Sequence, residues 1–297
     1  MKQPFGSIMA AVDRDERPVE VAAKAVALAR LSGGEVELFH CDSERAYSRQ
    51  HQYDPRAAVR ARESCLDESR RFLDSLWRSL GVKDVKASMS VACESPLYAG
   101  IVHAVERDHP DLVVRGTGGA HRARNASGDS SAGLDANDWE LVRACPSPLL
   151  LTHGRVWKPH PVIAAAVDLS AAESAELTRA ILRTAAGVAQ SAGGDLEIVH
   201  AGLFDAQPQE ESSRRAALAE RARDAGVEAA AVHLIRGEPA AVLPEFAQRR
   251  DFDLIVLGAL THRKALTALV GTLTGKLIET LDCDCLLVKP ARRSQAA

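Results

Sequence analysis

The sequence contains two copies of one pattern, and this internal repeat constrains the fold more than any other feature. Each copy opens with an apolar stretch ending in Val-Asp, runs through a helical segment to a Gly-Gly pair, and returns as an apolar stretch ending in His. The matched positions are Val12-Asp13 and Val167-Asp168, Gly33-Gly34 and Gly193-Gly194, and His40 and His200. Because the 297 residues repeat at about half their length, we predict two similar domains.

A segment with two prolines separates the two copies. It reads "THGRVWKPHPV" and covers 152–162, which is typical of a linker. We therefore expect one domain over residues 1–154 and a second over residues 160–293. Each is long enough to bury a core of its own.

Short apolar stretches alternate with helical segments in each copy. In the second copy this pattern predicts strands at 162–168, 195–201, 228–235, 253–258 and 285–289. Ser170-Ala-Ala-Glu173 fits a capping box at the start of the first helix, and Pro239 falls where a first helical turn tolerates proline. The alternation predicts two three-layer α/β/α domains, flavodoxin-like or Rossmann-like, each with a parallel five-stranded sheet ordered 3-2-1-4-5.

Composition excludes several classes of function. The net charge is −3 and the pI is about 6.4, which does not indicate a nucleic-acid partner. No stretch approaches the ~18 apolar residues of a membrane span, and the N-terminus does not resemble a signal peptide. The six cysteines have no framework spacing, so we expect reduced thiols in a cytoplasmic protein.

The predicted strand order brings two distant segments of the second copy together. In an open α/β sheet, ligands bind beyond the carboxyl ends of the strands where the winding reverses, here between strands one and four. Strand one ends at Asp168 and strand four at Gly258. Asp168 could accept hydrogen bonds from adenine or ribose. Gly271 and Thr272 open the next helix, where free N–H groups and the helix dipole favour a phosphate.

These residues resemble a universal stress protein domain. The likeness rests on Val167-Asp168-Leu169-Ser170, the Gly-Gly pair, the strand ending in His200, and Gly258 followed by Gly271-Thr272. It covers nearly the whole chain as two tandem domains, and the segments "DWELVRACPSPLLL" and "LDCDCLLVKP" are similar to the E-type tandem members. The resemblance implies a flavodoxin-like fold, a cytoplasmic stress-response role, and often no classical enzymatic activity.

The ATP-binding branch of that family carries Gly-x2-Gly-x9-Gly-(Ser/Thr) after strand four. Carried over to this sequence, the first glycine is Gly258, the third is Gly271 and the hydroxyl residue is Thr272. The middle glycine is replaced by Thr261, whose branched side chain stands where phosphates would approach the backbone, or whose hydroxyl could itself donate. The resemblance also implies that Ala201, after His200, contacts the adenine pocket.

The first copy departs from that motif in another way. Gly116 and Gly119 fit the first two glycines, but Gly133 aligns with Gly271 and Leu134 takes the hydroxyl position. Asp15 stands where the second copy has Ser170. We therefore expect any nucleotide in the second domain, and a structural or protein-contact role for the first with its Gly/Ser-rich loop at 116–133.

Two hypotheses remain open from the sequence. In the first, the second domain binds ATP or ADP as a sensor or regulatory ligand, with at most slow hydrolysis, since no catalytic motif or convincing general base is present. In the second, both domains are nucleotide-free and form an intramolecular pseudo-dimer that engages protein partners. A pocket for another small molecule is a third alternative. The fifth-strand edges, 149–151 and 285–289, are candidate pairing surfaces for a homodimer.

Three smaller features can each be interpreted in two ways. Cys283 and Cys285 fit core packing better than a metal site, because no second Cys/His pair lies near them. His40 and His200 fit semi-buried, hydrogen-bonded histidines better than site residues. The basic run 262–264 could neutralise phosphate or simply be solvated.

Overall fold

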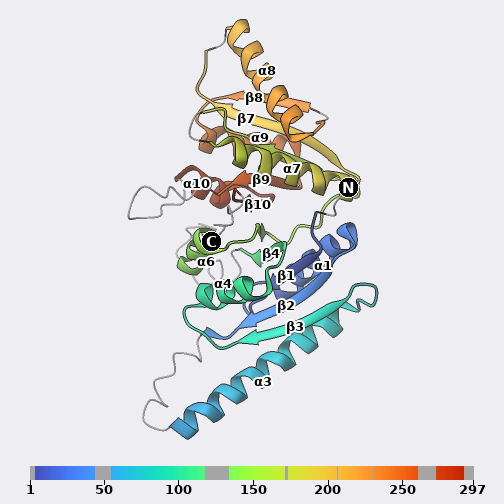
Figure 1. Ribbon diagram of the computed structural model, residues 1–297, viewed down its shortest axis with the longest axis vertical. Helices are drawn as coiled ribbons and strands as arrows, with labels where there is room; N and C mark the ends of the chain where they lie inside the picture. Colours follow the sequence, from blue (N-terminus) through green and yellow to red (C-terminus); the bar gives the residue numbers. More distant parts are fainter. Residues whose placement is uncertain are drawn as a thin grey trace, which may run out of the picture. The chain divides into compact units, whose positions relative to one another are not determined.

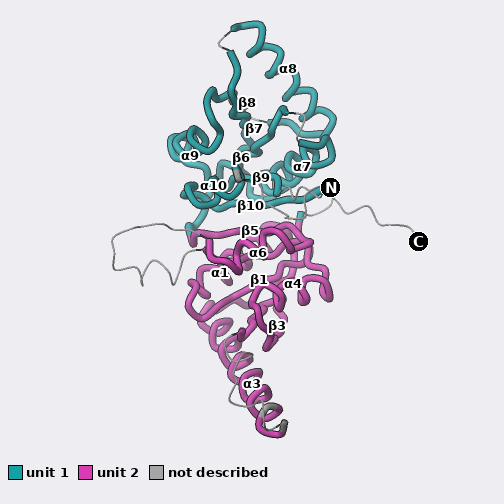
Figure 2. The backbone as a smooth tube through the Cα atoms, turned by 90° about the vertical axis from the view of Figure 1, so that its left-hand side faces the viewer, with its two compact units in different colours: residues 1–4, 155–297 teal, residues 5–154 magenta. Residues whose placement is uncertain are grey.

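The computed structural model describes residues 4–43, 55–117, 134–170, 173–205, 207–229, 231–259 and 272–290. The chain divides into two compact units, coloured separately in Figure 2. Residues 5–154 form unit 2, and residues 1–4 and 155–297 form unit 1. Thr261, Gly271, the 118–133 part of the unit 2 loop and the basic run at 262–264 lie outside the described residues.

Unit 2 is an alternation of strands and helices around one parallel sheet. Its elements are β1 (Ser7–Ala11), α1 (Pro18–Ser32), β2 (Glu35–Cys41), α3 (Pro55–Leu80), β3 (Ala87–Ala92), α4 (Leu97–Asp108), β4 (Leu112–Gly116), α6 (Ala136–Ala144) and β5 (Leu149–Thr152). Strand β1 pairs with β2 and β4, β2 pairs with β3, and β4 pairs with β5, all in parallel. In the numbering of the unit's own strands the order is 3-2-1-4-5.

Unit 1 repeats this arrangement. Its elements are β6 (Val162–Ala166), α7 (Ala175–Ala192), β7 (Asp195–Gly202), α8 (Pro208–Ala225), β8 (Ala231–Arg236), α9 (Pro239–Arg250), β9 (Leu254–Gly258), α10 (Thr272–Thr280) and β10 (Asp284–Val288). Strand β6 pairs with β7 and β9, β7 with β8, and β9 with β10, again all parallel.

Helices cover both faces of each sheet, so each unit has three layers (Figure 1). In unit 2, α1 and α3 pack on one side and α4 and α6 on the other; in unit 1, α7 and α8 face α9 and α10 across the sheet. Strand β4, which lies between β1 and β5, is buried along its whole length, as a parallel strand between two helical layers must be. The predicted α/β/α fold class is confirmed.

The two glycines of each repeated Gly-Gly pair occur for different steric reasons. Gly33 and Gly193 end α1 and α7 with φ of 63° and 62°, a left-handed conformation that glycine adopts without strain. Gly34 lies against the backbone that leads into β1, where a Cβ would stand 2.6 Å from the Phe5 carbonyl oxygen. A Cβ at Gly194 would stand even closer to the carbonyl oxygen of Pro161. Only glycine fits the second position of each pair, because a Cβ there would overlap a carbonyl oxygen.

The predicted capping box at Ser170 is wrong. Helix α7 begins at Ala175, and its N-cap is Ser174, whose hydroxyl accepts a hydrogen bond from the Leu177 N–H at 3.2 Å. The Ser170 hydroxyl is already engaged, because it donates to the carboxylate of Asp168 at 2.5 Å. Pro239, by contrast, does start α9, as predicted.

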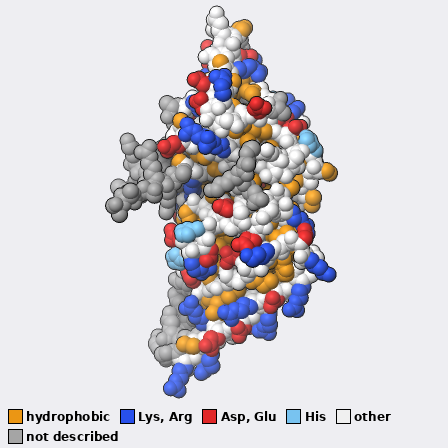
Figure 3. Space-filling view, turned by 45° about the vertical axis from the view of Figure 1, so that its right-hand side comes forward, with side chains coloured by type: hydrophobic (Ala, Val, Ile, Leu, Met, Phe, Trp, Pro, Cys, Tyr) orange, Lys and Arg blue, Asp and Glu red, His pale blue; other side chains and the backbone are white. Residues whose placement is uncertain are grey.

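On one face of the protein, charged side chains of both signs lie in small groups. On the face in Figure 3, Lys and Arg side chains are interspersed with Asp and Glu, without a continuous basic stripe. Of the helices in the described ranges, none combines the length and apolar character that a bilayer span requires.

Candidate functional site

The carboxyl ends of β6 and β9 lie side by side in unit 1. These neighbouring parallel strands pair Ala165 with Val256, so that the register runs on toward Asp168 on one strand and toward Gly258 and Ala259 on the other. Two segments ninety residues apart in the sequence therefore meet at the reversal point of the sheet, as the predicted topology requires. On the other side of β6, Ala166 pairs with Val199, and Ala201 comes next to Asp168 in the same register.

Asp168 organises the loop that follows β6. Its Oδ1 accepts a hydrogen bond from the Ser170 N–H at 2.8 Å, and its Oδ2 accepts one from the Ser170 hydroxyl. The Asp168 carbonyl accepts a hydrogen bond from Arg221 of α8 at 2.8 Å. The carboxylate is therefore held by its own loop, and Arg221 ties that loop to α8.

Glu173 adds a half-buried carboxyl group that the sequence analysis did not single out as a site residue. Its Oε1 accepts a hydrogen bond from the Thr178 hydroxyl at 2.7 Å. Burial, opposed by hydrogen bonds from Thr178 and the Asp168 backbone, raises its pKa from 4.5 to about 7. The signal that could have revealed it is its position in a polar loop immediately before a helix.

His200 lies buried at the end of β7 and is held on both ring nitrogens. Its Nδ1 hydrogen-bonds the Val167 carbonyl at 3.0 Å, and its Nε2 lies 3.4 Å from an Arg214 nitrogen. Burial lowers its pKa, which favours the neutral ring. The same Arg214 guanidinium stacks over Phe204, 4.7 Å from the ring centroid. In unit 2, the His40 Nδ1 makes the matching hydrogen bond to the Val12 carbonyl at 2.9 Å. Each histidine therefore holds the end of the first strand of its own unit.

Gly258 has a packing reason that is independent of any ligand. A Cβ at this position would stand 2.7 Å from the Leu177 Cδ2 of α7. Its carbonyl accepts a hydrogen bond from the Thr274 hydroxyl at 3.3 Å, which ties β9 to the first turn of α10. Helix α10 begins at Thr272, so its N-terminus is presented just beyond the β9 end.

The equivalent crevice of unit 2 is built around an ion-pair cluster. Arg115, next to Gly116 on β4, is 1% exposed and stands where unit 1 has Leu257. Its guanidinium forms an ion pair with Glu16 from the β1–α1 loop, and its Nε lies 3.4 Å from the Asp138 Oδ1 of α6. Burial raises the pKa of Glu16 to about 7 despite the opposing charge of Arg115. We call Glu16, Arg115 and Asp138 the Arg115 cluster.

The two cysteines near the C-terminus are core residues. Cys283 and Cys285 are 3% and 0% exposed, and burial raises the pKa of the Cys283 thiol to about 12. Within the described part of the chain, no group of three His, Cys, Asp or Glu residues is placed to hold a metal ion.

A profile of the universal stress protein family matches this chain twice, over residues 4–153 and 162–289. The chain belongs to the universal stress protein family. The two matches make it a tandem member, and membership supports a role in the stress response. It is similar to universal stress protein E of Photorhabdus laumondii, with 20% identity over 305 residues covering 96% of this chain and 95% of the relative. Universal stress protein E of Escherichia coli K12 is 19% identical over 304 residues, covering 96% and 94%.

Solved structures share the fold over nearly the whole chain. A universal stress protein from Archaeoglobus fulgidus has a TM-score of 0.72 at 15% identity and covers 98% of this chain and 100% of its own. One from Pseudomonas aeruginosa has a TM-score of 0.71 at 22% identity, covering 98% and 95%. At these identities the likeness establishes the tandem fold alone.

Proposed function

We propose that this universal stress protein acts in the cytoplasm and binds ATP or ADP in unit 1, as a sensory or regulatory ligand of the stress response. The observation that carries the proposal is the meeting of the β6 and β9 ends, whose register brings Asp168 beside Gly258 and Ala259. Gly271 and Thr272 follow these residues in the sequence. Asp168 would accept hydrogen bonds from the ribose or adenine, with Ser170 orienting its carboxylate. Ala201 would leave room for the base.

The phosphates would lie at the N-terminus of α10. Gly271 and Thr272 would supply backbone N–H groups and a hydroxyl, which the helix dipole reinforces. Thr261 would either crowd the phosphates or donate to them. ATP is a ligand in this proposal, with hydrolysis slow at most, because neither Glu173 nor Asp168 is assigned as a base.

Unit 2 would not bind nucleotide. The Arg115 cluster fills its crevice with an internal cation that is already paired with two carboxylates. Leu134 replaces the hydroxyl residue at the end of the loop. We propose a structural or protein-contact role for this unit.

One observation favours the competing hypothesis of a nucleotide-free interaction scaffold, an intramolecular pseudo-dimer. Both carboxylate oxygens of Asp168 already accept hydrogen bonds from Ser170. A ribose would have to displace the Ser170 hydroxyl or share the carboxylate with it.

Isothermal titration of the full chain with ATP and with ADP separates the two hypotheses. We expect a dissociation constant below ~1 mM, which corresponds to about −4 kcal/mol. Gly271→Asp places a negative charge against the phosphates and should weaken binding at least tenfold, about 1.4 kcal/mol. Thr261→Gly restores the glycine of the ATP-binding branch and should tighten nucleotide binding.

Gly133→Asp, at the aligned position of unit 2, is the matched control and should leave the affinity unchanged. Absence of heat with both nucleotides at ~1 mM, in the wild type and in Thr261→Gly, would overturn the nucleotide proposal in favour of the scaffold.

A further inference from the structure

An arginine of helix α8 reaches the loop that carries Asp168 in unit 1. Helix α8 packs against α7, which follows that loop. Arg221 of α8 is half-buried, and its Nη1 donates a hydrogen bond to the Asp168 carbonyl at 2.8 Å. A hydrogen bond from a charged donor is stronger than one between neutral groups. Arg221 therefore fixes the backbone from which the Asp168 carboxylate projects.

The same nitrogen of Arg221 also reaches the other end of the loop. It lies 3.4 Å from the hydroxyl of Thr178, near the start of α7, and that hydroxyl donates to the Glu173 carboxyl group at 2.7 Å. Thr178 is 2% exposed, so water competes little for these contacts. Arg221 thus holds the loop directly at Asp168 and through Thr178 at Glu173.

The residue before Asp168 is held from the neighbouring strand. The Val167 carbonyl hydrogen-bonds the His200 Nδ1 of β7 at 3.0 Å. Two successive carbonyls at the end of β6 are therefore bound by side chains from two other elements, His200 from β7 and Arg221 from α8. Together with the bonds from Ser170 to the carboxylate, they set the direction of the Asp168 side chain.

Unit 2 ties its equivalent loop to a helix in the opposite direction. There the arginine belongs to the loop: Arg14 follows Asp13, and its Nη2 donates to the Glu68 carbonyl of α3 at 3.2 Å. The Asp13 carbonyl accepts a hydrogen bond from the Glu16 N–H of its own loop at 3.4 Å. In unit 1 the helix donates to the aspartate, whereas in unit 2 the loop donates to the helix.

We propose that Arg221 is a positioning residue of the nucleotide site, which acts by holding Asp168 in the orientation that accepts hydrogen bonds from the nucleoside. This inference rests on the proposed function of unit 1. A loop that is already ordered does not lose conformational freedom when the ligand binds, so holding it increases affinity. The effect belongs to the nucleoside end of the site, because the phosphates are proposed to lie at α10.

The test compares ATP with inorganic triphosphate by isothermal titration of the full chain. Arg221→Met keeps a long side chain but removes the donors, and it should weaken ATP binding about tenfold or more. The affinity for triphosphate, which has no nucleoside, should not change. Arg221→Lys, which keeps a charged donor, should recover part of the loss. A purely structural defect would weaken the binding of both ligands.

Arg215→Met is the matched control for the loss of an arginine from α8. Arg215 lies on the same helix, and its Nη1 donates to the Val232 carbonyl of β8 at 2.9 Å. This contact resembles that of Arg221 but does not involve the Asp168 loop. Arg215→Met should therefore leave the affinity for ATP unchanged.

A double variant tests whether Arg221 acts through Asp168. Asp168→Ala should weaken ATP binding, and adding Arg221→Met should weaken it no further. Equal ATP affinity in the wild type and Arg221→Met, or losses that add in the double variant, overturns this inference and leaves the proposed function standing. A wild type that does not bind ATP overturns both. If Arg221→Met does not fold, Arg221→Gln, whose amide sits on a shorter arm, takes its place with the same expected loss.

Discussion

Arg115 is the residue that most clearly distinguishes the two units. Its guanidinium is buried with Glu16 and Asp138, while the aligned Leu257 of unit 1 is a plain core side chain. Arg115→Leu copies unit 1 but leaves the buried Asp138 and the half-buried Glu16 without their cation. We expect a loss of about 3–5 kcal/mol in the free energy of unfolding, measured by urea denaturation near pH 7.

The matched control combines Arg115→Leu with Glu16→Gln and Asp138→Asn, which removes the stranded charges. It should regain most of the lost stability, because replacing a whole buried ionic group costs far less than breaking it. Equal losses in the single and the triple variant would contradict an electrostatic origin.

Glu173 makes the stability of unit 1 depend on pH. Its pKa is raised from 4.5 to about 7 in the folded protein, so the folded state binds its proton more tightly than the unfolded state does. This contribution is complete below pH 4.5 and is lost as the pH rises through about 7. One such group lowers the free energy of unfolding by at most about 1.4 kcal/mol per pH unit.

Glu173→Gln removes that titration while keeping an acceptor for Thr178. Thermal denaturation between pH 4.5 and 7 should therefore show a shallower decline in the variant than in the wild type. Parallel curves would show that Glu173 does not titrate in this range.

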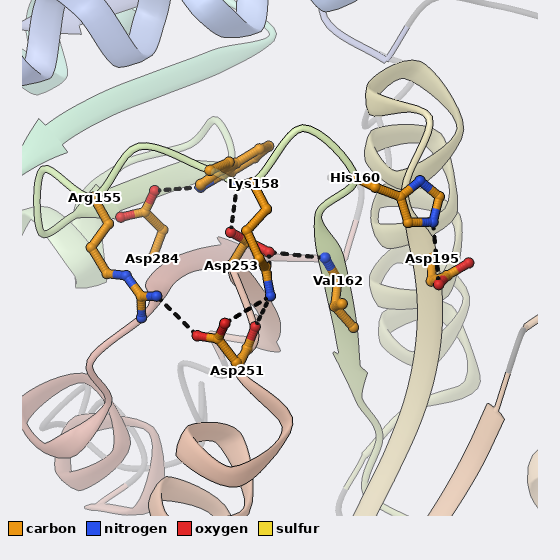
Figure 4. Close-up of polar contacts among 9 residues, drawn as sticks. Arg155, Lys158, His160, Val162, Asp195, Asp251, Asp253 and Asp284 are labelled. Atoms are coloured by element: carbon orange, nitrogen blue, oxygen red, sulfur yellow. Dashed lines mark hydrogen bonds and ion pairs between the residues drawn. The ribbon is translucent and has the colours of Figure 1, made fainter.

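At the scale of elements, one aspartate in each unit fixes where strand one begins. In unit 2, Asp111 before β4 accepts hydrogen bonds from the Gly6 and Ser7 N–H groups at 2.8 and 3.0 Å. In unit 1 the equivalent Asp253 accepts from the Lys158 and Val162 N–H groups at 2.9 and 3.0 Å. Figure 4 shows Asp253 between these two donors.

The chain leading into unit 1 is thereby held against its sheet. Arg155 and Lys158 add ion pairs with Asp251 at 3.0 and 3.1 Å, and Trp157 donates to Asp284 at 2.8 Å (Figure 4). Asp253→Ala removes the acceptor for two backbone donors and should cost about 3 kcal/mol. Limited trypsin digestion after Arg155 should become faster.

Asp111→Ala is the matched substitution in unit 2. It should destabilise that unit less than Asp253→Ala destabilises unit 1, because Asp111 is exposed and Asp253 is buried, and it should not change cleavage after Arg155, because its partners are Gly6 and Ser7. Equal cleavage in wild type and Asp253→Ala would show that the other contacts of the segment suffice to hold it.

At the scale of the whole molecule, the tandem chain is two copies of one fold with unequal crevices. We expect titration calorimetry to give one nucleotide per chain, and hydrogen exchange to show ligand protection confined to residues 155–290. A stoichiometry of two, or protection near Arg115, would contradict the assignment of unit 2 as nucleotide-free.

The sequence predicted the repeat, the α/β/α class and the meeting of Asp168 with Gly258, because these follow from periodicity and from the handedness of βαβ connections. It missed the N-cap at Ser174, since Ser170 and Ser174 are equally good caps until the Asp168 carboxylate takes one of them. The roles of Thr261 and Gly271 at the phosphates, on which the nucleotide proposal depends, remain predictions.

Local chemistry therefore determined the architecture of this protein from the sequence alone. Gly33 and Gly193 end their helices in a left-handed conformation that glycine adopts without strain, and the apolar strands had to lie between helices. Only the tertiary structure decided which polar side chains meet, such as Arg115 with Glu16 and Asp138. The reason is that such contacts join residues far apart in the chain, and their burial, distances and charges exist only once the sheet and its helices are packed.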